Sequence, residues 1–181
     1  YADWVTPFSK IISDYTVTVN IEAGHQITTS LGLSNKDYSN FVISSVDAEV
    51  TVGASFPSSS SVISVVNGTS PVLNTLINVD NQTNVSSYNL TGAATGFINS
   101  GEGMKNGGDR GLHVQNASIC YANGCIFTGF QAAGVHVSRA STLQCADAVL
   151  TGNSVNPANT FGAVYASRGS TIHAPDVDAS G

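Results

Sequence analysis

Short runs in which apolar and polar residues alternate recur along the chain. The clearest runs cover residues 15–21, 41–43, 49–52, 62–66 and 76–79. Because neighbouring side chains of a strand point to opposite faces, alternation with a period of two is typical of β-strands with one buried face. Segments rich in Gly, Ser and Asn separate the runs and predict turns. A short helix over residues 4–13 and an exposed loop over residues 56–61 complete the predicted elements.

An internal repeat spans the C-terminal third of the chain. Residues 111–118 align with 134–141 at an offset of 23, and the same register aligns 125–129 with 148–152. A third copy starts at Gly162 and, after one inserted residue, aligns 167–172 with 138–143. The unit holds several short alternating runs and no helical period. Such a unit is typical of one coil of a parallel β-solenoid.

Stacked coils place equivalent residues above one another at a spacing of about 4.8 Å. Columns that hold only apolar side chains are therefore expected to point into the core. Three such columns are Leu112, Val135, Ala163; Cys120, Leu143, Ile172; and Cys125, Ala148, Val177. The same register places Cys145 with Ala122 and Ala174. We therefore expect the three cysteines to be buried, reduced thiols and not disulfide or zinc ligands.

Composition supports an all-β protein. The chain carries 6 Lys and Arg against 12 Asp and Glu, a net charge of −6, and only 10% of its residues are charged. This acidic balance argues against nucleic-acid binding, and the scarcity of charge against solvated helices. Ser, Thr and Asn supply 56 of the 181 residues and build the polar surface instead. No apolar run approaches the ~20 residues of a membrane span, so no membrane insertion is expected.

We expect residues 1–181 to form one β-solenoid domain. Residues 96–181 carry the regular coils, and residues 1–95 carry β coils with a less regular period. The chain begins with neither an initiator Met nor a signal peptide, and its last residues fall inside the repeat. These features predict that it is a fragment of a longer polypeptide.

Three sequence features together suggest a family. They are VTVNIEAG at 17–24, KDYSNFVI at 36–43, and coils of the form Gly-hydrophobic-x-hydrophobic-x-x-Ala/Gly-Ser within 111–181. This pattern resembles the right-handed, single-stranded parallel β-helix regions of bacteriophage tail fibres and tailspikes. Pectate-lyase-like enzymes share the same coil pattern, and a secreted bacterial enzyme or adhesin solenoid is a further alternative.

The resemblance implies a homotrimer on the virion tail, assembled in the host cytoplasm beside other tail proteins. Its partner would be a host surface glycan, either capsule or lipopolysaccharide. Some members of the family also cleave that glycan as hydrolases or lyases. The leading hypothesis is therefore a binding segment, and the alternative is a polysaccharide depolymerase. No cofactor or metal is expected, because the four His are dispersed along the chain.

Outward columns of the repeat supply the first candidate site. They are Asn116, Arg139, Arg168; His113, His136, Val164; Tyr121, Gln144, His173; and Gly124, Asp147, Asp176. Arginine forks suit the carboxylates of uronic or sialic acids, and the other side chains can hydrogen-bond or stack on sugars. The candidate substrate-binding residues are His136, Arg139, Gln144, Asp147, Arg168 and His173. A solvated face or a subunit interface is the alternative interpretation.

The loop over residues 101–110 supplies the second candidate site. It holds four charged residues in ten positions. Glu102 and Asp109 are candidates for the acid and base of a glycosidase, which needs two carboxyl groups flanking the scissile bond. Lys105 and Arg110 are candidates for binding substrate and stabilising the anion formed in a lyase reaction. The alternative is a Gly-rich turn whose charges face water or a neighbouring subunit.

Overall fold

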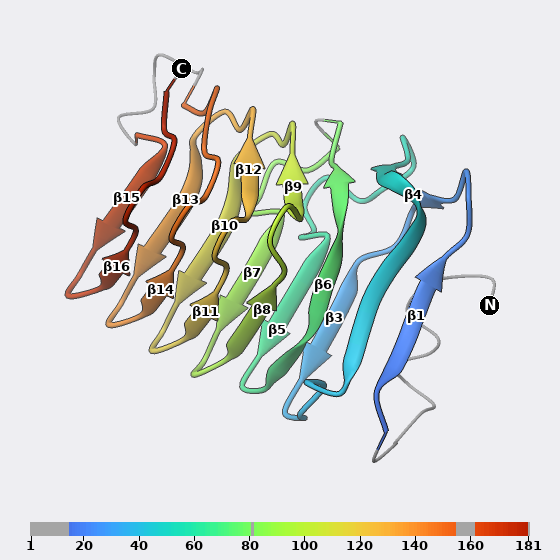
Figure 1. Cartoon of the computed structure of the whole chain (residues 1–181), viewed down its shortest axis with the longest axis horizontal. Helices are drawn as coiled ribbons and strands as arrows, with labels where there is room; N and C mark the ends of the chain where they lie inside the picture. The colour runs from blue at the N-terminus through green and yellow to red at the C-terminus, as the bar shows by residue number, and fades with distance from the viewer. Residues whose placement is uncertain (1–14, 81, 155–161, 181) are drawn as a thin grey trace.

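Every regular element in the described part of the chain is a strand. The computed structural model describes residues 15–80, 82–154 and 162–180, and the helix predicted over residues 4–13 lies outside this part of the chain. The strands stack in parallel as a β-solenoid of about six turns. Its coils lie side by side from β1 (Val17–Ile21) to β16 (Thr171–His173), as Figure 1 shows. The prediction of an all-β parallel solenoid is confirmed.

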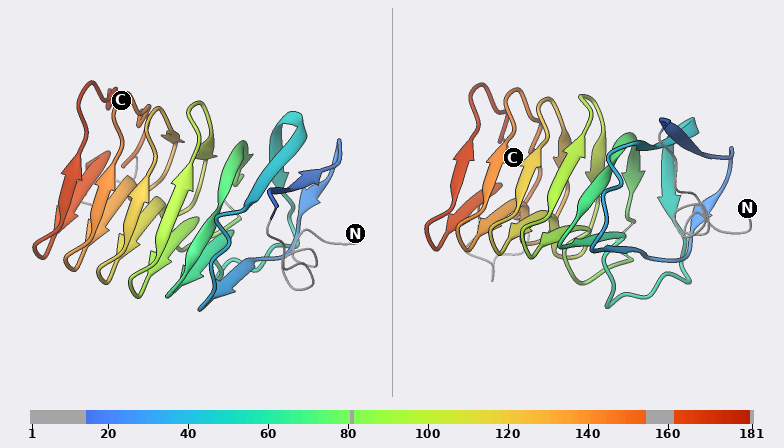
Figure 2. Two further views of the ribbon diagram at one scale, coloured as in Figure 1. Left: turned by 60° about the horizontal axis from the view of Figure 1, so that its bottom comes forward. Right: turned by 90° about the horizontal axis from the view of Figure 1, so that it is seen from below.

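Two parallel sheets contain the strands, and they face each other across the core (Figure 2). Each coil contributes to both, so neighbours within a sheet come from successive coils. The six-stranded sheet runs in the order β15 (Val164–Ser167), β13 (Ala133–Ser138), β10 (Arg110–Gln115), β7 (Tyr88–Thr91), β5 (Ile63–Val66), β3 (Leu31–Ser34). The ten-stranded sheet runs in the order β1, β4 (Phe41–Val52), β6 (Thr69–Asn78), β8 (Thr95–Ile98), β11 (Ile119–Tyr121), β14 (Thr142–Gln144), β16.

The ten-stranded sheet has a second arm. The pairing of β4 with β6 shifts register between Ser44 and Glu49. Beyond the shift, the end of β4 pairs with β2 (Gln26–Ile27), and the end of β6 pairs with β9 (Gly103–Lys105). β12 (Ile126–Thr128) continues this arm by pairing with β9. A coil therefore has three sides, two in the ten-stranded sheet and one in the six-stranded sheet.

Inward columns of apolar side chains fill the space between the sheets. The predicted column Cys120, Leu143, Ile172 is confirmed by the strand register. The predicted column Leu112, Val135, Ala163 is wrong in its last member, because Val135 pairs with Val164. Cys120, Cys125 and Cys145 are buried and free, as expected.

The loop predicted to be exposed is anchored by one side chain. Phe56 is only 4% exposed and belongs to the core, whereas residues 57–59 face the solvent. The prediction of an exposed loop is therefore wrong for Phe56. A phenyl ring buries a large apolar area, so its removal from water holds the start of the loop against the coils.

A left-handed turn closes each coil where the six-stranded sheet leads into the ten-stranded sheet. Its first residue has φ between 51° and 69° in every coil; from β3 to β15 these residues are Asn35, Asn67, Gly92, Asn116, Arg139 and Arg168. Asn and Gly tolerate this conformation, whereas for other L-residues it costs on the order of 1 kcal/mol. The two arginines are therefore the unfavourable members of the column.

Hydrogen bonds between coils fix the geometry of this corner. The Ala117 N–H donates to the Arg139 carbonyl at 3.0 Å, and the Ala140 N–H donates to the Arg168 carbonyl at 3.1 Å. Beside them, the Ser118 N–H donates to the buried Ser141 Oγ at 3.1 Å. Each turn is thus held in place by the turn of the next coil.

The alternation along β14 gives a test of the register. We expect Leu143→Ala, which opens a cavity at a fully buried position, to lower the free energy of unfolding by about 2–5 kcal/mol. Gln144→Ala on the same strand faces the solvent, so it should change stability by no more than about 0.5 kcal/mol. Urea denaturation of both variants measures the difference. Equal losses would contradict the inward position of Leu143.

Candidate functional site

The outward face of the six-stranded sheet carries a hollow of about 380 Å³. It lies over β10, β13 and β15 and reaches the left-handed turns that follow β13 and β15. Its lining residues are His113, Gln115, His136, Ser138, Arg139, Tyr165, Ser167 and Arg168. Three of the sequence-predicted site residues, His136, Arg139 and Arg168, therefore lie together in one site.

Three rings form a column along one side of the hollow. The ring centroids of His113 and His136 lie 4.5 Å apart, and the two rings are nearly parallel, at 6°. The centroid of Tyr165 lies 4.9 Å from that of His136, and the two rings are tilted by 48°. The register pairs His136 with Tyr165, so the predicted ladder of His113, His136 and Val164 is wrong in its last member.

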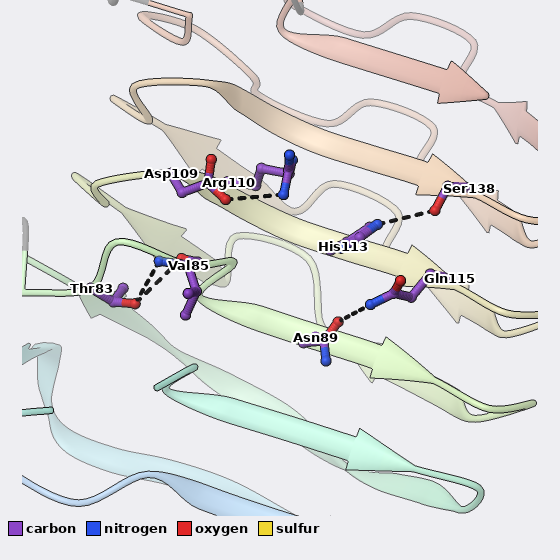
Figure 3. A network of polar contacts seen from close by, with 8 residues as sticks. All are labelled: Thr83, Val85, Asn89, Asp109, Arg110, His113, Gln115 and Ser138. Atoms are coloured by element: carbon purple, nitrogen blue, oxygen red, sulfur yellow. Dashed lines mark hydrogen bonds and ion pairs between the residues drawn. The ribbon is translucent and has the colours of Figure 1, made fainter. Parts of the chain in front are cut away.

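Hydrogen bonds to neighbouring coils hold these side chains in place. His113 Nε2 lies 3.1 Å from Ser138 Oγ, and Gln115 Nε2 donates to Asn89 Oδ1 at 3.1 Å; Figure 3 shows both contacts on the same face. His136 Nε2 lies 3.3 Å from Ser167 Oγ, which repeats the His113 contact one coil further. The site is therefore ordered before any ligand arrives.

The two imidazoles are neutral at pH 7. Burial lowers the pKa of His113 to about 3, assisted by the neighbouring His136 and by the positive charges of Arg110 and Arg139. Burial, Arg110 and Arg168 likewise lower the pKa of His136 to about 4. The fixed positive charge of the hollow consequently resides on its arginines.

Arg139 and Arg168 are solvent-exposed and occupy the left-handed turn. Arg139 Nη1 donates to the neutral amide oxygen of Asn116 at 3.1 Å. Within residues 15–80, 82–154 and 162–180, neither arginine forms an ion pair with a carboxylate. The lining contains no Asp or Glu, so the hollow is cationic although the chain is acidic.

The charged residues of the loop over residues 101–110 do not gather in one cluster. Asp109 pairs with Arg110 at 3.0 Å at the start of β10, as Figure 3 shows. Lys105 on β9 instead pairs with Glu49 on β4, at 2.6 Å. Burial raises the pKa of Asp109 against the opposing effect of Arg110, and burial also raises the pKa of Glu102.

Glu102 precedes β9 and Asp109 precedes β10, so β9 and the turn after it separate the two carboxyl groups along the coil. Their assignment as an acid and base pair stays a prediction.

The remaining predicted residues lie on the ten-stranded sheet. Gln144 and His173 are exposed and share a column with Tyr121. Tyr121 stacks on Phe97 with 5.5 Å between the ring centroids. Asp147 occupies the left-handed turn after β14, with φ of 55°. These residues face away from the hollow.

Sequence reasoning missed Gln115, Ser138, Tyr165 and Ser167 as parts of the site. The register of the repeat nevertheless contained the information that places Tyr165 in the site. Counting back two residues from Ser167, which aligns with Ser138, places Tyr165 beside His136. The predicted alignment instead put the extra residue of the third copy inside the strand.

Residues 15–80, 82–154 and 162–180 contain no group of three or more His, Cys, Asp and Glu side chains able to hold a metal ion. The same residues include no helix long and apolar enough to cross a membrane. Comparison with protein-family models, curated proteins and solved structures finds no match to this chain.

The low pKa of His113 predicts a pH-dependent stability. Below about pH 6.5 the unfolded chain binds a proton that the folded chain refuses down to about pH 3, so the free energy of unfolding falls as the pH falls through this window. We expect His113→Asn to make the loss between pH 7 and pH 5 smaller by about 1 kcal/mol, allowing for solvent screening.

Asn fits this position because Asn89 occupies it in the preceding coil. Chemical denaturation at a series of pH values measures the difference, with Gln115→Asn as a control that removes no titrating group. Parallel pH profiles for the wild type and His113→Asn would show that His113 is not held neutral by the fold.

Proposed function

We propose that this chain is a segment of a phage tail fibre or tailspike that binds a host cell-surface polysaccharide, capsule or lipopolysaccharide. The hollow on the outward face of the six-stranded sheet is the observation that carries this proposal. Its volume of about 380 Å³ falls within the range of small-molecule sites. The site offers the hydrogen-bonding groups and flat ring surfaces with which proteins contact sugars.

Preorganisation supports a binding role. Each lining residue belongs to a coil that is hydrogen-bonded to its neighbours, and His113 and His136 each contact a serine of the next coil. Binding to such a surface orders few side chains, so less of the interaction energy is lost as entropy. A row of repeated polar columns also suits a ligand that itself repeats, such as a glycan chain.

We infer that the segment functions within a homotrimer on the virion tail, next to other tail proteins. Support comes from the ten-stranded sheet, where Tyr121 and Ile119 are 39% and 38% exposed. Large apolar side chains gathered on an outward sheet face favour contact with another protein surface. This face is separate from the hollow, so subunit contact and glycan binding are compatible.

A polysaccharide depolymerase is the second candidate function. One observation favours it: burial raises the pKa values of both Glu102 and Asp109. A carboxyl group that keeps its proton nearer to neutral pH suits a general acid in glycosidic cleavage. Arg110, paired with Asp109, supplies a cation for a lyase alternative.

A panel of purified bacterial capsule and O-antigen polysaccharides tests the binding proposal. We expect at least one polysaccharide to bind the wild-type chain, and we expect Gln115→Trp, which fills the hollow, to abolish that binding. Thr18→Trp places the same ring at an exposed position of β1, away from the hollow and from Tyr121, and should leave binding unchanged. Biolayer interferometry measures affinity, and denaturation midpoints establish that both variants are folded.

Three results would count against these proposals. Failure to bind any polysaccharide would overturn the glycan-binding function, and equal loss of binding in Gln115→Trp and Thr18→Trp would show that the hollow is not the site. New reducing ends or unsaturated uronides released from a bound polysaccharide would establish cleavage. Full cleavage by Glu102→Gln and Asp109→Asn would then exclude the predicted acid and base.

A further inference from the structure

The outward chemistry of the six-stranded sheet changes abruptly in its last three coils. One outward column runs from Gly32 through Ser64 and Asn89 to His113, His136 and Tyr165. The column at the left-handed turn changes one coil later, from Asn and Gly through Asn116 to Arg139 and Arg168. Small neutral side chains are thus replaced by rings and cations within one patch, the hollow.

The two arginines are not required by the fold. The turn forms with Asn at residues 35, 67 and 116 and with Gly at residue 92, which tolerate its positive φ better than Arg does. Because Ala93, Ala117 and Ala140 in these turns also have positive φ, the conformation alone assigns no role to a side chain. What sets the two arginines apart is that Asn or Gly fills their position in every earlier coil.

Charge supplies the second argument. Arg139 and Arg168 occupy equivalent positions of adjacent coils, about 4.8 Å apart at the backbone, where like charges repel. Neither forms an ion pair with a carboxylate among the described residues, and the lining holds no acidic side chain. Arg110 lies close enough to lower the pKa values of both histidines, but its pairing with Asp109 cancels its charge, so the uncompensated charge of the hollow belongs to Arg139 and Arg168. An anionic ligand relieves this repulsion.

We propose that the hollow binds an acidic saccharide unit, with its carboxylate between Arg139 and Arg168 and its sugar ring against His136 and Tyr165. This inference rests on the proposed glycan-binding function and specifies the class of sugar. Along each strand the ring column and the arginine column are three residues apart, about 10 Å. One sugar ring together with the length of an arginine side chain spans that distance, and a uronic acid carries its carboxylate directly on the ring.

The experiment uses the same polysaccharide panel, each member in its native form and after chemical reduction of its carboxyl groups to neutral alcohols. Members that carry phosphate but no carboxylate are included. We expect the wild-type chain to bind carboxylate-bearing members and to lose at least about ten-fold in affinity after reduction. Added salt should weaken the same interaction.

Arg139→Asn and Arg168→Asn are the matched variants, because Asn occupies this turn in other coils. Each should weaken binding roughly ten-fold or more, while the denaturation midpoint stays the same or rises. A merely structural role for the arginines would lower the midpoint instead. Lys36→Asn removes the same charge from an exposed turn residue after β3, at the other end of the six-stranded sheet, and should leave binding unchanged.

The possible outcomes separate this inference from the function on which it rests. Binding that survives carboxyl reduction, or that is confined to neutral or phosphate-bearing members, would overturn the carboxylate assignment and leave glycan binding intact. Equal effects of Lys36→Asn and Arg139→Asn would show a general effect of charge and overturn the assigned site. Failure of the wild-type chain to bind any member would overturn the glycan-binding function itself.

Discussion

The backbone hydrogen bonds between successive coils determine what this structure can do. Because neighbouring strands of a parallel sheet lie about 4.8 Å apart and pair in register, every side chain has a counterpart directly above and below it. Each side chain therefore contacts the side chain at the equivalent position of the next coil, so the two must be compatible. The core satisfies this constraint with stacked apolar side chains such as Cys120 and Leu143. The surface satisfies it mainly with Ser, Thr and Asn, which stack without electrostatic cost.

The same constraint explains why charges are scarce and where they are informative. Only 10% of the residues are charged, since like charges in one column repel. Asp147 and Asp176 share a column, but both have positive φ, which Asp adopts more readily than most residues. The conformation of the turn therefore explains why Asp occurs at these two positions. Arg139 and Arg168 have the same backbone conformation without that preference, and for this reason we propose that a ligand accounts for them.

Much of the fold was predictable because a repeat exposes its own register. The offset of 23 residues between the first two regular coils placed Leu112 on Val135 and His113 on His136, as the structure has them. The third coil was harder, because it is longer. A one-residue error at Val164 exchanged inward and outward faces and removed Tyr165 from the site.

Three other features could not be predicted from the alternation of apolar and polar residues. The strands before residue 95 join the same sheets, but β4 and β6 bend across a corner, and the alternation along β4 changes phase at its register shift with β6. The salt bridge between Lys105 and Glu49 joins residues far apart in sequence and needs the stacking of β4, β6 and β9 to be known. The hollow could not be predicted from the pattern, because its lining comes from three coils and depends on the relative positions of all three.

Disulfide trapping measures the central claim, that β13 and β15 stack with Ser138 beside Ser167. Paired residues about 4.8 Å apart lie within the reach of a disulfide, whereas Ser138 and Tyr165, offset by two residues, lie about 8 Å apart. The native cysteines are buried with raised thiol pKa values and so interfere little. The account predicts rapid oxidation of Ser138→Cys with Ser167→Cys and slow oxidation of Ser138→Cys with Tyr165→Cys, followed by mass spectrometry. Faster oxidation of the second pair would contradict the register and with it the site.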